Sequence, residues 1–70
     1  MNEQDAQLVL DYLRAYPDRF VSPIEVCRKA GGRHRFFEEP RWAVPVLIQL
    51  RDRGLVEMNE AGYYRIVTRP

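Results

Sequence analysis

The side chains best suited to chemistry gather in residues 22–37. Four basic residues and one acidic residue give this segment a net charge of +3. Its basic side chains, which are suited to holding phosphate groups, are Arg28, Lys29, Arg33 and Arg35, with His34 beside them. The whole chain carries only +1. Such a patch on a near-neutral protein can hold a bound anion but does not dominate long-range attraction.

Metal and catalytic patterns are not supported by the sequence. Cys27 and His34 are the only soft metal ligands, and two ligands do not make a structural zinc site. A cysteine nucleophile needs a positioned base, and none is identifiable for Cys27, which is interpreted as a small buried side chain. The neighbouring carboxylates of Glu38 and Glu39 point in different directions and are interpreted as solvated. We therefore expect no enzyme, no metal and no cofactor.

Length and composition favour one small binding module. The chain of 70 residues is expected to form a single domain, 1–70, and its 46% hydrophobic and 30% charged residues are typical of globular proteins. The single cysteine excludes an internal disulfide, which favours a reducing compartment. No apolar run approaches the roughly 20 residues that cross a bilayer, and the first residues lack a secretory signal. The sequence predicts a cytoplasmic protein with no membrane contact and no small-molecule substrate.

Two helices are predicted around the start of the basic segment. Apolar residues recur with helical spacing over 3–16. The run Ser22-Pro23-Ile24-Glu25 is a capping box, and Gly31-Gly32 ends the second helix at about Ala30. Its inward side chains are predicted to be those of Ile24, Val26, Cys27 and Ala30. Residues 33–40 are expected to form a connector with at most a turn of helix.

A third helix and a β-hairpin are predicted for the second half of the chain. The helix spans about 41–53, but Pro45 within it removes a backbone hydrogen bond at a cost of about 3 kcal/mol. We therefore expect this helix to bend or to begin late. Strands are predicted at 55–58 and 63–67, joined by a loop that contains Gly62, and a strand stub is predicted at 20–21.

The aromatic pairs divide between core and surface. One of Phe36 and Phe37 is expected to pack at the junction of the second and third helices, with the other half exposed. Tyr63 and Tyr64 lie on opposite faces of one predicted strand, because side chains alternate along a strand. One of the two tyrosines therefore packs inward. Tyr64 shares its face of the strand with Ile66, so if Tyr64 is the inward residue, Ile66 packs inward with it.

The element order, with Leu50-Arg-Asp-Arg-Gly54-Leu-Val56 at the end of the third helix, resembles the winged helix-turn-helix family. The match spans residues 7–67. It implies a mainly α fold of three helices with a small antiparallel β-hairpin wing. In this fold residues 22–30 form the first helix of the helix-turn-helix pair, and residues 41–53 form the second, which is the recognition helix. The function it implies is duplex DNA binding as a transcription regulator or accessory module, with the recognition helix in the major groove.

Under this resemblance two kinds of contact with DNA are expected. Arg41 and Gln49, on the outward face of the third helix, are suited to base edges. Phosphate contacts are assigned to the basic segment, namely Arg28, Lys29, Arg33, His34 and Arg35. The wing does not add to these contacts, because Glu60 at its tip and Glu57 before it repel phosphate.

A second hypothesis is a protein-interaction or homodimerisation module. The outward face of the third helix also carries Trp42, Pro45 and Ile48, which form an apolar strip suited to a protein partner or a second copy. Trp42 either folds back over its own helix or stands out as the anchor of that interface. The two hypotheses share one fold and differ in which outward surface is used.

Overall fold

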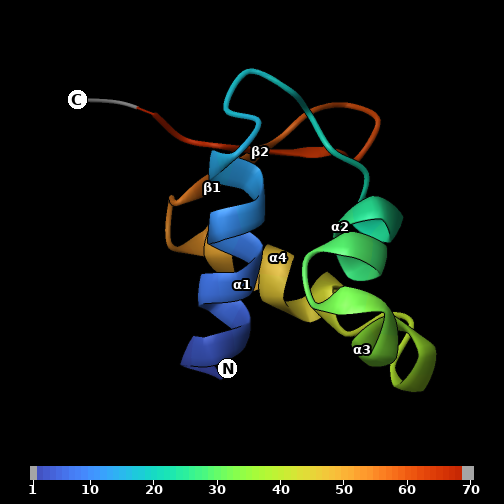
Figure 1. Ribbon diagram of the computed structural model, residues 1–70. Helices are drawn as coiled ribbons and strands as arrows, with labels where there is room; N and C mark the ends of the chain where they lie inside the picture. The colour runs from blue at the N-terminus through green and yellow to red at the C-terminus, as the bar shows by residue number, and fades with distance from the viewer. Residues whose placement is uncertain (1, 69–70) are drawn as a thin grey trace.

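The computed structural model describes residues 2–68, which form four helices and a two-stranded antiparallel sheet (Figure 1). In chain order the elements are α1 (Glu3–Arg14), α2 (Pro23–Lys29), α3 (Gly32–Glu38), α4 (Ala43–Asp52), β1 (Val56–Met58) and β2 (Tyr64–Ile66). Helix α4 packs against α1 and α2, α3 packs against α2, and β2 packs against α1. The mainly helical fold with a hairpin is confirmed, but the predicted connector forms a fourth helix, α3.

Helix α1 forms for the local reasons that its sequence suggests. The side chain of Asn2 accepts a hydrogen bond of 2.8 Å from the backbone N–H of Gln4 and so caps the first turn. Its core face carries the buried side chains of Ala6, Val9, Leu10 and Leu13. The helix ends at Arg14 rather than at residue 16.

Helix α2 begins at the predicted cap. The Ser22 hydroxyl accepts a hydrogen bond of 3.2 Å from the backbone N–H of Glu25. The other half of the capping box is absent, because the carboxylate of Glu25 is bound to Tyr12 and Arg19 instead. The prediction that Ile24 points inward is wrong: it is 52% exposed, because it lies about 200° around the helix from the buried Val26.

Helix α4 begins late, as Pro45 requires. Pro45 is the third residue of the helix, where a backbone N–H has no intrahelical acceptor, so the missing donor costs nothing. The core face of this helix consists of Ala43, Val46, Leu47 and Leu50. At its end Gly54 adopts φ 78°, and the N–H of Leu55 donates to the carbonyl of Leu50 at 3.0 Å. This Schellman ending directs the chain into β1.

The hairpin closes the other end of the core. Val56 pairs with Ile66 and Met58 with Tyr64. Tyr64 and Ile66 are buried, whereas Tyr63 is exposed, so the predicted alternation of faces is confirmed. Val21 exchanges two backbone hydrogen bonds with Tyr64, of 2.7 and 2.8 Å, which confirms the predicted strand stub. The sheet is thereby tied to the segment that leads into α2.

Candidate nucleic-acid interface

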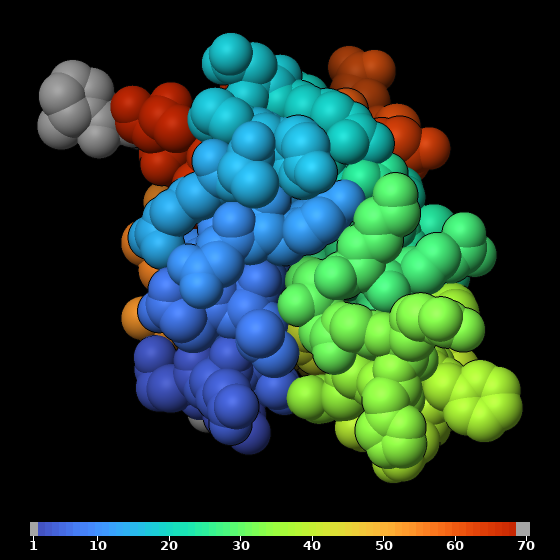
Figure 2. Space-filling model, viewed as in Figure 1, coloured from blue at the N-terminus to red at the C-terminus, as the bar shows by residue number. Residues whose placement is uncertain are grey.

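The C-terminal end of α2 and helix α3 form one projecting corner of the molecule, at the right of Figure 2. We call the exposed residues Arg28, Lys29, Arg33 and His34 the basic corner. Helix α3 follows α2 after only two residues, because Gly32 adopts φ 83° and turns the chain sharply. No residue of α3 is fully buried, so most of this short helix is open to solvent.

Three cations of the basic corner have no acidic partner. Within residues 2–68, none of Arg28, Lys29 and Arg33 forms an ion pair. The guanidinium of Arg28 lies 5.4 Å from the centre of the Phe36 ring, a cation–π contact that joins α2 to α3. Three of the predicted phosphate ligands, two on α2 and one on the adjoining α3, therefore carry charges without an acidic partner.

The imidazole of His34 points into solvent and contacts its own helix. Its Nε2 lies 2.6 Å from the carboxylate of Glu38, one turn further along α3. Both side chains are mostly exposed, so the pair is solvent-screened and easily exchanged for another anion.

Arg35 is placed differently from the other basic residues. Its guanidinium donates two hydrogen bonds to the carboxylate of Asp5 on α1, of 2.9 and 3.0 Å, and a third to Glu39 at 3.1 Å. It also lies 4.6 Å from the centre of the Trp42 ring. The hydrogen bonds to Asp5 raise the pKa of Arg35. The expectation that Arg35 is free to hold phosphate is corrected, because its donors fasten α3 to α1.

Trp42 is a core residue rather than part of an exposed strip. Only 6% of it is accessible, and its indole N–H donates to the backbone carbonyl of Cys27 at 2.9 Å. This carbonyl lies in the last turn of α2, where helical carbonyls lack intrahelical donors. The interpretation of Trp42 as an exposed interface anchor is therefore wrong. Its indole N–H pairs with a carbonyl oxygen at the end of α2, and its ring lies under the guanidinium of Arg35.

The outward face of α4 lines an open hollow of about 640 Å³ beside the first turn of α1. Arg41, Pro45 and Gln49 lie along this hollow, together with the acidic side chains of Asp5 and Glu39. Ile48 lies outside its lining and is 47% exposed. The two predicted base-contacting residues, Arg41 and Gln49, are thus brought together, but they line a hollow distinct from the one that Arg33 and His34 line.

The acidic residues of the hairpin differ in their effect. Glu57 forms an ion pair with Arg65 at 3.0 Å, and the guanidinium of Arg65 covers the ring of Phe20. Glu60 at the tip is exposed and has no ion pair within the described residues. The hairpin therefore presents negative charge only at its tip.

Two features of this site escaped the sequence-based prediction. Helix α3 was indicated by pairs four residues apart, Arg33 with Phe37, His34 with Glu38 and Arg35 with Glu39. Phe37 is 86% exposed, well beyond the half exposure that was expected for one of the two phenylalanines. Phe36 packs against the core as the other member of the pair.

Comparison of the chain with protein-family models, curated proteins and solved structures finds no match. In the part of the chain that the structure describes, no three His, Cys, Asp or Glu side chains are grouped so as to hold a metal ion. None of the helices there combines the length and the apolar character needed to cross a membrane.

Proposed function

We propose that this domain binds duplex DNA by holding its phosphates on the basic corner. The observation that carries the proposal is the contrast in charge compensation. Arg19, Arg35 and Arg65 all form close ion pairs, whereas Lys29 and Arg33 are exposed and form none within residues 2–68. Arg41 and Arg51 also lack an ion pair there, but they do not belong to α2 or α3. Uncompensated basic side chains bind DNA by releasing the counterions condensed on its phosphates.

The resemblance of the element order to the winged helix-turn-helix family supports this proposal without requiring α4 to enter a groove. Helix α1, the Val21 strand stub, α2, α4 and the hairpin follow one another in the order of that family, and α3 is an addition between α2 and α4. An element that enters a DNA groove must project, and α3 projects whereas the outer face of α4 lines a hollow. We therefore place the contact on α2 and α3, in a transcription regulator or an accessory module.

The experiment is a titration of a random-sequence duplex over a range of salt concentrations, followed by fluorescence anisotropy. The variant Lys29→Ala/Arg33→Ala removes two charges from the corner. Its control, Arg14→Ala/Arg51→Ala, removes two exposed arginines from α1 and from the far end of α4.

The expected result follows from counterion release. Losing two phosphate contacts reduces the magnitude of the slope of log K against log salt by about 1.8 and weakens binding at 0.1 M salt by up to about 60-fold. The control variant changes both quantities much less. Equal effects of the two variants, or no duplex binding at low salt, would contradict the proposal.

A second candidate, protein interaction or self-association, is favoured by the exposed Pro45 and Ile48 on α4. The burial of Trp42 leaves these two as the remaining members of the predicted apolar strip. Sedimentation of the wild-type protein and of Ile48→Asp at high concentration tests this use. A dimer that the substitution abolishes supports it, and a monomer in both samples contradicts self-association.

A further inference from the structure

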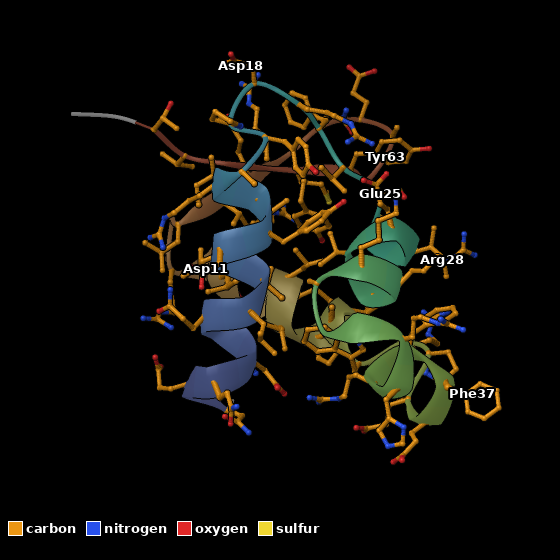
Figure 3. The ribbon with its side chains drawn as sticks, in the orientation of Figure 1. Asp11, Asp18, Glu25, Arg28, Phe37 and Tyr63 are labelled. Carbon is orange, nitrogen blue, oxygen red and sulfur yellow. The ribbon has the colours of Figure 1, made fainter. Side chains whose placement is uncertain are left out.

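Phe37 is the most exposed of the large apolar side chains in the described residues, with 86% of its surface accessible. Figure 3 shows its ring pointing away from the body of the domain, on the same side as Arg28. Burying a phenylalanine side chain stabilises a protein by about 1.5–3 kcal/mol. Little of this stabilisation is realised in the free domain, so the ring is available to a ligand.

The neighbours of Phe37 indicate the chemistry of that ligand. On a helix the residues three and four positions earlier share a face, and here they are His34 and Arg33. The three side chains together line a shallow hollow. A protein-docking surface is a contiguous apolar patch, whereas this ring stands beside Arg33 and His34, the latter paired with Glu38. An exposed aromatic ring beside basic side chains is the arrangement that proteins use for single-stranded nucleic acid.

The support of α3 holds the ring in place. The neighbouring Phe36 packs against the core and carries the guanidinium of Arg28 over its ring. The preceding residue, Arg35, lies about 100° around the helix from Phe36 and is bound to Asp5 on α1. Because these two contacts fasten α3, Phe37 is presented on a fixed helix rather than on a loose loop, which lowers the entropy that is lost when it binds.

We propose that Phe37 stacks on an unpaired nucleobase while Arg33, beside it, and Arg28, on the same side of the domain, hold the adjoining phosphates. This inference rests on the proposed binding of nucleic acid and adds a ligand class, namely a single-stranded segment or a duplex that exposes an unpaired base. The stacking is independent of base identity, because every base presents a π face. The basic residues thus supply affinity for any nucleic acid, and Phe37 supplies preference for unpaired bases.

The test compares anisotropy titrations of a short thymidine oligonucleotide and of a blunt duplex of the same length. The variants are Phe37→Ala, Phe37→Leu, which keeps an apolar side chain without a ring, and Phe37→Trp, which keeps a ring. Tyr63→Ala is the control, because Tyr63 is another exposed aromatic residue and lies on the hairpin.

Phe37→Ala and Phe37→Leu are expected to weaken binding of the single strand by at least about fivefold, with duplex binding changed less than about twofold. Phe37→Trp is expected to keep single-strand binding close to that of the wild type, and Tyr63→Ala is expected to leave the binding of both oligonucleotides unchanged. Equal losses for both ligands, or rescue by leucine, would overturn the stacking role while duplex binding by the basic corner stands. No binding of either oligonucleotide would overturn both proposals and would favour a protein as the partner that covers Phe37.

Discussion

Replacing Asp5 by asparagine is expected to destabilise the domain and to release α3 from α1. The carboxylate of Asp5 receives two charge-assisted hydrogen bonds from Arg35, and its side chain is only 12% exposed. In the variant an amide N–H₂ group faces one guanidinium nitrogen, so one bond is lost and the other loses its ionic character. A hydrogen bond to a charged group contributes about 1.5–3 kcal/mol.

The net loss is smaller than the sum of the two bonds. The Arg35 side chain is 31% exposed and keeps its contact with Glu39, so solvent and that carboxylate compensate part of the effect. We expect a decrease of about 2 kcal/mol in the free energy of unfolding, which lowers Tm by about 10 °C in a domain of this size.

The assay is urea and thermal unfolding followed by circular dichroism, with Asp11→Asn as the matched control on the same helix. Asp11 forms only exposed contacts, a hydrogen bond of 2.8 Å from the Gln7 side chain and a contact of 3.7 Å with Arg14, so its replacement should cost less than about 0.5 kcal/mol. Equal stabilities of the Asp5 and Asp11 variants would refute the conclusion that the Asp5–Arg35 pair fastens α3.

Three further substitutions test the packing around α2. Gly31→Ala should destabilise the domain by about 1–3 kcal/mol, because a Cβ there would lie 2.8 Å from the ring of Trp42. Trp42→Phe should cost about 2–4 kcal/mol, since it leaves the buried Cys27 carbonyl unpaired and opens a cavity. Burial, with a hydrogen bond to Glu25 as a second cause, raises the pKa of Tyr12 to about 12. The wild-type protein should therefore lose stability between about pH 10, where an unfolded tyrosine ionises, and pH 12, whereas Tyr12→Phe should lack this loss.

Denaturant unfolding measures all three substitutions. Gly31→Ala with wild-type stability would show that the Trp42 ring has room to move. Trp42→Phe at a cost below about 1 kcal/mol would contradict the capping role of the indole. For Tyr12, the sign follows from proton binding: the folded state keeps its proton above pH 10 while the unfolded state loses it, so unfolding is favoured as the pH rises. Identical pH profiles of wild type and Tyr12→Phe would contradict the raised pKa.

Local chemistry made much of the fold predictable from the sequence. The Ser22 cap and the left-handed glycine at Gly54 act within a few residues, so each marks an end of a helix without tertiary information. The late start of α4 was predictable for the same reason. Proline is disfavoured in the interior of a helix but tolerated in its first turn, so a helix that contains Pro45 begins shortly before it.

The site depends on contacts that the sequence does not encode locally. Asp5 and Arg35 are thirty positions apart, and nothing near either residue identifies the other as its partner. Trp42 occupies an outward position on the predicted long helix, but that helix begins after it, so the ring is free to turn beneath α3. The prediction that Arg35 and Trp42 lie on exposed surfaces is wrong. The positions of both side chains depend on how the predicted connector, residues 33–40, packs against the rest of the domain.

The most direct test of the central claim is a two-dimensional ¹H–¹⁵N NMR titration of the full chain with a short random-sequence duplex at low salt. The account predicts that amide shift changes concentrate in residues 28–37, at the basic corner and α3. Shift changes confined to residues 41–52 and to the hairpin loop at 59–62, or no changes at all, would contradict it.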